Sequence, residues 1–157
     1  GNDLRISVAR AAVFAHHNPK VLDMNAEHYW MDQGIQTFRM KLVPHTGTWK
    51  ENNIARITEE FIAPAVSIYQ GIHGGKLPKS GSFLSCDKPS VIVTSVKQAE
   101  GSDDIIIRCV ETNGVATEAK IDLKFAGTQW SGSFGACEIK TLRLSKGKIR
   151  EVNLLEA

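Results

Sequence analysis

The chain of 157 residues is 42% hydrophobic, enough for one good core or for two small β-sandwiches packed together. Its nineteen Lys and Arg and seventeen Asp and Glu give a net charge of +2 with no run of five like charges, which argues against nucleic-acid and membrane-surface partners. Apolar runs such as 11–15 fall well short of the roughly 18 residues of a membrane span. No signal-peptide apolar region is found at the N-terminus, so we predict a soluble globular protein.

Two segments in the first third of the sequence have the period of half-buried strands. Apolar and polar residues alternate in 4–10 and again in 35–45, while the polar, irregular stretch 14–34 predicts a long surface loop between them. A strand that starts at residue 4 leaves little room for a preceding partner, so we expect the chain to be cut from something longer. The apolar faces are Leu4, Ile6 and Val8 in the first segment and Phe38, Met40 and Leu42 in the second.

A change of period predicts one short helix at about residues 49–62. Thr48 and Glu51 have the spacing of a capping box, and Pro64 follows the end of the pattern. The apolar residues at helical spacing are Ile54, Ile57 and Phe61.

The sequence after the helix consists of strand-like segments and turns. Residues 65–72 predict another strand, and the Gly, Pro and Ser content of 73–82 predicts a linker. Beyond the linker, short strand-like segments bounded by turns are typical of an antiparallel β-sandwich. We expect these strands within 90–99, 104–113, 117–126, 137–145 and 148–155. The fold is therefore predicted to be mainly β with one short helix.

The three cysteines are Cys86, Cys109 and Cys137. They lie 23 and 28 residues apart, and none belongs to a C-x-x-C pair. We expect reduced thiols in the core.

The carboxylates form no recognised catalytic motif. Glycosidase carboxylates face each other roughly 5 to 10 Å apart across a sugar, which the sequence neighbours Glu59–Glu60 and Asp103–Asp104 do not achieve. P-loop, G-x-G-x-x-G, G-x-S-x-G and H-E-x-x-H motifs are also missing from the sequence.

The histidines leave two interpretations open. His16 and His17 are adjacent and would point to opposite faces of a strand. A loop-borne metal site that adds His28 or His45 is one interpretation, and solvated or hydrogen-bonded histidines are the other.

The aromatic residues also leave two interpretations open. Tyr29 and Trp30 stand together in the long loop, Trp49 opens the predicted helix and Trp130 lies near a turn. Such rings either stack against a sugar or pack in a core or domain contact.

Six short motifs follow one another in the second half of the chain. They are Leu77-Pro78, Ser82-Phe83-Leu84, Asp87-Lys88-Pro89, Lys97-Gln98-Ala99-Glu100, Arg108 to Gly114 and Glu138 to Arg143. In this order they resemble the C-terminal region of glycoside hydrolase family 38, the retaining α-mannosidases. Upstream, residues 4–14 and 32–51 are similar to further segments of that family, although Ala12 stands where Pro is common and the loop 15–30 is rich in His and aromatic residues.

The resemblance implies a large enzyme whose N-terminal domain holds a zinc ion and an Asp nucleophile, neither of which matches residues of this chain. It further implies that residues 1–75 are the end of the large β-sandwich domain and residues 76–157 the small C-terminal β-sandwich, with the joint at 71–82. We therefore expect no catalytic residue, metal or cofactor in this chain.

Three residues are the predicted substrate-binding set. The resemblance implies that the β region helps to complete the sugar pocket, where the guanidinium of Arg10 would bond sugar hydroxyls or orient a carboxylate. A surface or structural salt bridge is the alternative role of Arg10. Tyr29 and Trp30 complete the set as sugar-stacking rings, and His45 is expected to be structural.

Three functional hypotheses follow. The first is a noncatalytic C-terminal β-domain of a retaining α-mannosidase, whose partners are the catalytic domain of the same polypeptide, an α-mannoside bound by the full enzyme, and further copies of the parent enzyme. The second is a freestanding carbohydrate-binding β-sandwich module. The third is a small metal hydrolase built on His16, His17 and His45.

Overall fold

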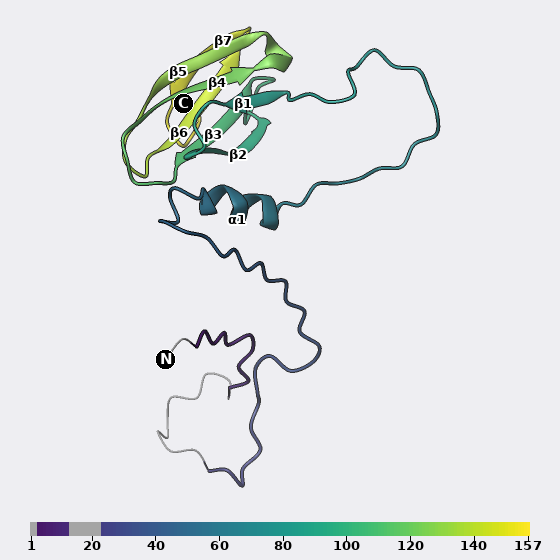
Figure 1. Cartoon of the computed structure of the whole chain (residues 1–157), viewed down its shortest axis with the longest axis vertical. Helices are drawn as coiled ribbons and strands as arrows, with labels where there is room; N and C mark the ends of the chain where they lie inside the picture. Colours follow the sequence, from purple (N-terminus) through teal and green to yellow (C-terminus); the bar gives the residue numbers. More distant parts are fainter. Residues whose placement is uncertain (1–2, 13–22) are drawn as a thin grey trace. The chain divides into compact units, whose positions relative to one another are not determined.

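A computed structural model describes residues 3–12 and 23–157, and its contacts divide the chain into the units Gly1–Val43 and Pro44–Ala157. The second unit contains the helix α1 and seven strands (Figure 1). The elements are α1 (Ile54–Ile62), β1 (Leu84–Cys86), β2 (Val91–Gln98), β3 (Ile105–Glu111), β4 (Thr117–Leu123), the short 3-10 helix η1 (Lys124–Ala126), β5 (Thr128–Phe134), β6 (Ile139–Ser145) and β7 (Lys148–Val152). The described residues contain no helix with the length and apolar character of a membrane span.

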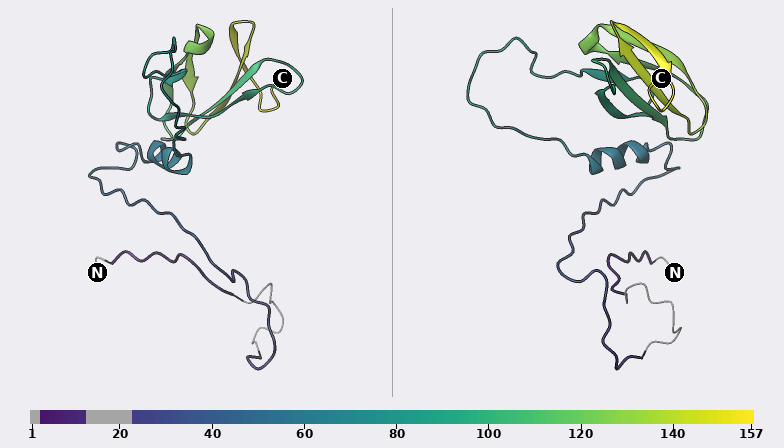
Figure 2. Two further views of the ribbon diagram at one scale, coloured as in Figure 1. Left: turned by 90° about the vertical axis from the view of Figure 1, so that its right-hand side faces the viewer. Right: turned by 180° about the vertical axis from the view of Figure 1, so that it is seen from behind.

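The strands form two antiparallel sheets, which Figure 2 shows from two further sides. One sheet has the order β1-β4-β5 and the other the order β2-β3-β6-β7. The β2–β3 register shifts between Val93 and Ser95, so Thr94 is the extra residue of a bulge. The predicted fold class, mainly β with a sandwich and one helix, is confirmed.

The core lies between the two sheets. Both sheets contribute buried side chains, as the alternating pattern of each strand requires. The core residues are Ala119, Ile121, Leu123 and Phe134 from the three-stranded sheet and Val91, Ile107, Cys109, Leu142 and Leu144 from the four-stranded sheet. Full burial of one such aliphatic or phenyl side chain stabilises the fold by roughly 1.5–3 kcal/mol.

The five strands predicted after the linker are all present, and the turn between the last two follows from the sequence. Lys146 (φ 49°) and Gly147 (φ 77°) occupy the two turn positions between the paired residues Ser145 and Lys148. Positive φ at both positions defines the hairpin turn that suits the twist of antiparallel strands.

Two strands, β1 and β5, were not predicted. In β5 the side chains of Trp130 and Phe134 face inward with their rings edge to face, 5.7 Å between centroids. Between them stands Gly132, where an added Cβ would lie 2.5 Å from the Trp130 ring. Position 132 must therefore be glycine to leave room for the Trp130 ring. The Ser and Gly content of β5 makes this strand difficult to predict from the sequence.

The predicted helix is present but starts five residues later than expected. Thr48 and Glu51 make the hydrogen bonds of a capping box, since the backbone N–H of Thr48 donates to Glu51 Oε2 (2.6 Å) and the N–H of Glu51 donates to Thr48 Oγ1 (3.3 Å). This box closes a separate turn at 49–53, which Asn53 ends in a left-handed conformation (φ 51°). The helix proper then begins at Ile54.

The strands predicted at 4–10, 35–45 and 65–72 are wrong, because the structure has no strand in any of these segments. Their apolar side chains are largely exposed, from 46% at Val8 to 110% at Ile72. A strand needs a neighbouring strand to receive its ladder hydrogen bonds and a second layer to cover its apolar face. The described residues place neither beside these segments, so alternation alone does not produce a strand there.

Candidate functional site

The predicted substrate-binding residues all belong to the first unit. The backbone N–H of Met31 donates to the carbonyl of Ala12 at 2.8 Å, which joins the segment that carries Arg10 to the segment that carries Trp30. Arg10 is exposed, and the rings of Tyr29 and Trp30 are 88% and 46% exposed. Their assignment to sugar binding stays a prediction.

The histidines that the structure describes have local partners. His28 Nε2 lies 2.7 Å from the Asp23 carbonyl oxygen, and His45 Nδ1 lies 3.3 Å from Asn52 Nδ2. Asn52 also donates to the carbonyls of Thr46 and Thr48, so His45 is part of the turn before the helix, as expected for a structural residue.

A metal site was the other interpretation of the histidines. His16 and His17 lie outside the described residues. Within 3–12 and 23–157, no group of three or more His, Cys, Asp and Glu side chains is placed to hold a metal ion.

The two carboxylate pairs do not form dyads. Glu59 and Glu60 are both exposed on α1. Asp103 Oδ1 accepts from Gln98 Nε2 at 2.9 Å, while Asp104 Oδ2 accepts from Arg143 Nε at 2.7 Å. Hydrogen bonds from Ser145 and Arg143 lower the pKa of Asp104. Asp104 therefore serves as an ionised partner of Arg143 within the fold.

Trp130 and Trp49 are the other aromatic residues that were expected either to stack against a sugar or to pack in a core. Trp130 packs half-buried against the core, so core packing is confirmed for this ring. Trp49 is 46% exposed in the turn before α1, with the ammonium of Lys50 5.5 Å from the ring centroid.

Glu111, the acidic residue of the Arg-x-x-Glu-x-x-Gly motif, is a buried anchor for two loops. Its side chain accepts backbone N–H bonds from Asn113 (2.9 Å), Gly114 (2.7 Å), Val115 (3.1 Å) and Cys137 (3.1 Å). Burial raises the pKa of this carboxyl and the four N–H donors lower it, with a net shift downward from 4.5. The motif glutamate therefore holds the turn after β3 and the loop before β6 in place.

Glu156, near the end of the chain, is a second buried carboxylate, 6% exposed. Its Oε1 lies 2.6 Å from Lys97 Nζ and 3.5 Å from Arg108 Nη2, and its Oε2 accepts the backbone N–H of Glu100 at 3.1 Å. Arg143 Nη1 donates to the Glu156 carbonyl at 2.7 Å. Three charged motif side chains and the backbone N–H of Glu100 therefore hold the segment after β7 against the strands.

Three further charged motif residues, Asp87, Glu138 and Lys140, also have structural partners. Asp87 Oδ1 accepts the backbone N–H of Lys120 at 2.7 Å, which joins the residue after β1 to β4. Glu138 Oε2 accepts the N–H of Gly135 at 2.6 Å, and Lys140 Nζ lies 3.2 Å from Glu138 and 2.8 Å from Glu151. These contacts stabilise the sandwich and leave no catalytic cluster among the motif residues that the structure describes.

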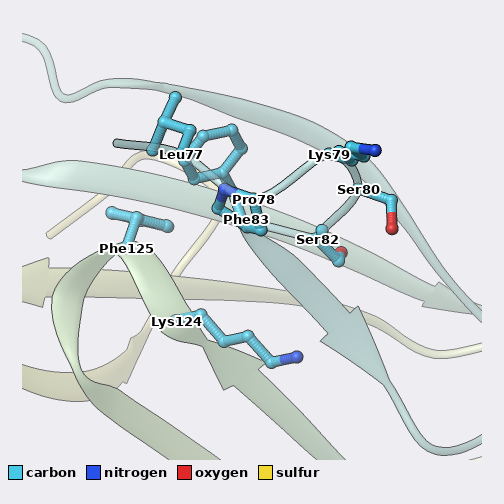
Figure 3. Close-up of a pocket in the computed structure, with 9 residues that line it drawn as sticks. Leu77, Pro78, Lys79, Ser80, Ser82, Phe83, Lys124 and Phe125 are labelled. Carbon is cyan, nitrogen blue, oxygen red and sulfur yellow. The ribbon is translucent and has the colours of Figure 1, made fainter. Parts of the chain in front are cut away.

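Four motif residues, Leu77, Pro78, Ser82 and Phe83, help to line an open cavity of about 490 Å³ that the sequence did not predict (Figure 3). Figure 3 shows Leu77, Pro78 and Phe83 on one side and Phe125 on the other, with Lys79 and Lys124 extending beside them. The N–H of Phe125 donates to the Phe83 carbonyl at 3.4 Å, which attaches the end of the linker to η1. This cavity marks where residues 77–83 meet the three-stranded sheet.

The cysteines are free thiols in three different environments. Cys109 is buried in the core and Cys86 is half-buried beside it, as expected for core thiols. Cys137 is exposed, so the prediction of a core thiol is wrong there. It occupies a left-handed turn position (φ 56°) whose N–H is bound by Glu111, and that turn lies at the surface.

The fold and the motif contacts together define a seven-stranded antiparallel β-sandwich domain whose motif residues serve its own architecture. Residues 90–157 match the family model of the glycosyl hydrolases family 38 C-terminal beta sandwich domain. Over these residues the chain is therefore similar to the C-terminal β-sandwich domain of family 38, which confirms the resemblance seen in the motifs from β2 onward. No curated protein matches the chain, and no solved structure does.

The match does not extend to the upstream residues. The similarity of 4–14 and 32–51 to the same family, and a domain boundary between residues 75 and 76, stay predictions.

Proposed function

We propose that this chain acts as a noncatalytic β region of a retaining α-mannosidase. The observation that carries the proposal is the family 38 match over 90–157, together with the structural role of every charged motif residue in that range. In this proposal a zinc-dependent domain of the same polypeptide hydrolyses the α-mannoside, because a retaining mechanism needs a nucleophilic carboxylate and an acid/base carboxylate at a sugar pocket.

The exposed apolar rows of the first unit support a role in packing. Leu4, Ile6 and Val8 are 75%, 60% and 46% exposed, and the row from Phe38 to Leu42 is similarly uncovered. Rows of this kind are commonly buried against another domain or subunit. We propose that they pack on the catalytic region of the same polypeptide, and that Arg10 lies where this contact approaches the edge of the sugar pocket.

The test is an activity and metal measurement on the isolated chain. We expect no hydrolysis of an aryl α-mannoside above a mock preparation and no stoichiometric zinc after dialysis. Turnover that exceeds the mock preparation would contradict the proposal. The same assay on the parent polypeptide, with and without residues 90–157, is expected to show mannosidase activity that depends on the presence of the sandwich.

A carbohydrate-binding module is the second candidate, and the exposure of two adjacent aromatic rings favours it. Tyr29 and Trp30 offer stacking surface in the same unit as Arg10. This function predicts that mannose oligosaccharides bind the isolated chain and that Tyr29→Ala together with Trp30→Ala abolishes the binding. Tyr69→Ala is the matched control, since Tyr69 is 97% exposed in the loop after α1. A calorimetric titration without heat would exclude this candidate.

A further inference from the structure

Two of the three cysteines belong to different sheets and meet in the same core. Cys86 is the last residue of β1 in the three-stranded sheet, and Cys109 lies in β3 of the four-stranded sheet. Cys109 is fully buried in the core cluster, and Cys86 packs half-buried against that cluster. No family motif quoted above depends on Cys86, and neither thiol has a role in the proposed function.

The strand registers show that both thiols point inward. Cys86 stands directly opposite Ile121 in the β1–β4 ladder, and directly opposed residues project from the same face of a sheet. Ile121 is fully buried in the core, so Cys86 also faces the interior. Cys109 faces the same interior from the other sheet, where its opposed residue on β2 is Val93, which also packs against the core.

Cys86 lies on an edge strand of one sheet, and Cys109 lies on the second strand of the other sheet. β1 is an edge strand of its sheet, and residues 87–90 cross directly to β2, which is an edge strand of the other sheet beside β3. Facing sheets are typically about 10 Å apart, but a short crossing draws their edges together. A disulfide requires Cα atoms roughly 4.4–6.8 Å apart. Both thiols are free in the structure, so the bond requires the three-residue edge strand β1 to bring its terminal thiol to the other sheet.

The ionisation of the thiols agrees with this arrangement. Burial, and to a lesser extent the charge of the Cys86 thiolate, raise the pKa of Cys109 to about 12. Burial is also the main cause that raises the pKa of Cys86. Each thiol is therefore protonated at neutral pH, and thiol–disulfide exchange at this pair is slow but accelerates as the pH rises.

We propose that Cys86 and Cys109 form an inter-sheet disulfide when the chain meets a small-molecule disulfide such as glutathione disulfide. The Cys86 sulfur attacks one sulfur of the oxidant, and the displaced glutathione leaves with the proton of Cys86. The Cys109 sulfur then attacks the Cys86 sulfur and displaces the second glutathione, which takes the proton of Cys109. Two protein thiols are oxidised to one disulfide and one glutathione disulfide is reduced to two glutathione molecules.

Peptide mapping of the native chain tests this pairing, because trypsin places the three cysteines on three peptides. These are 80–97 with Cys86, 109–120 with Cys109 and 125–140 with Cys137. After oxidation with glutathione disulfide and digestion without reductant, we expect 80–97 linked to 109–120 with the loss of two hydrogens. The exposed Cys137 should carry a glutathione adduct instead. Linkage through 125–140, or glutathione adducts at Cys86 without the link, would overturn the proposal.

Cysteine variants and changes of solvent distinguish a disulfide that the fold directs from random oxidation of the thiols. Cys86→Ala should leave Cys109 as an unmodified thiol, whereas Cys137→Ala should leave the linked pair unchanged. The rate of linkage should rise about tenfold from pH 7 to pH 8, because the thiolate fraction of a group with a raised pKa grows tenfold per pH unit. In urea, where the sheets are separated, the preference for this pair should disappear. A preference that persists in urea would show that the fold does not direct the pairing.

A stability measurement shows whether the sandwich accepts the bond. The oxidised chain is expected to unfold at a higher urea concentration than the reduced chain, since the bond restricts the unfolded state. An equal or lower midpoint would show that the bond strains the two sheets, and would overturn the assignment of this pair as a site built for linkage.

Discussion

Replacement of Glu111 tests most sharply the claim that the family motifs are structural. Four backbone N–H groups donate to its carboxylate, and the residue is 1% exposed. In Glu111→Gln one oxygen becomes an NH₂ group that cannot accept, and the remaining bonds lose their charge. A hydrogen bond to a charged group contributes about 1.5–3 kcal/mol, against about 0.5–1.5 kcal/mol for a neutral one, and an unpaired buried donor costs about 1–3 kcal/mol. We expect a total loss of about 3–5 kcal/mol in the free energy of unfolding.

The assay is urea unfolding followed by circular dichroism, in which the midpoint should fall while the slope with urea stays the same. The matched control is Glu118→Gln, because Glu118 is exposed on β4 and its replacement should change stability by less than about 0.5 kcal/mol. An equal effect of the two substitutions would refute the anchoring role of Glu111.

The pH dependence provides a second readout of the same residue. The pKa of Glu111 is lowered in the folded chain, so its stabilising effect is complete above the ordinary value of 4.5 and is lost as the pH falls below that value toward the folded pKa. The wild-type chain should therefore lose stability in this range more steeply than Glu111→Gln. Parallel curves for the two proteins would contradict the assigned shift.

Three further substitutions test other parts of the sandwich. Gly132→Val should destabilise the fold by about 1–3 kcal/mol, because its Cβ would lie 2.5 Å from the Trp130 ring, and tryptophan fluorescence should change with it. Leu142→Ala should cost about 2–5 kcal/mol in thermal or urea unfolding, since Leu142 is fully buried between the sheets. Glu156→Gln should release the segment after β7, seen as faster amide hydrogen exchange at 153–157, because Lys97 loses its 2.6 Å partner. No change in exchange would contradict the role of Glu156.

The second half of the fold could be predicted because each of its strands pairs with another strand of the same half. Segments such as 104–113 and 137–145 are rich in β-branched and aliphatic residues, and the turns between strands have clear signals. The strand at Thr128–Phe134 was missed since its pattern is built from Ser and Gly around two aromatic rings. The helix start was misplaced because the left-handed conformation of Asn53 has no signal in the apolar period.

The first half could not be predicted in the same way. The alternation in 4–10 and 35–45 shows which side chains favour burial. A strand forms only where a neighbouring strand accepts its hydrogen bonds and a second layer covers its apolar face. The structural roles of the motif residues could not be predicted from the sequence either. In the sequence Glu111 is only one position of a motif, whereas the four backbone donors around it show that it organises two loops.

The first measurement to make is the coding sequence immediately upstream of the codon for Asn2. If this chain is the noncatalytic end of an α-mannosidase, we expect an open reading frame that continues for hundreds of codons and encodes a His-x-Asp metal motif and a further Asp suited to be the nucleophile. A start codon at that point would contradict the assignment of this chain to a larger α-mannosidase and would favour a self-contained β protein that binds carbohydrate.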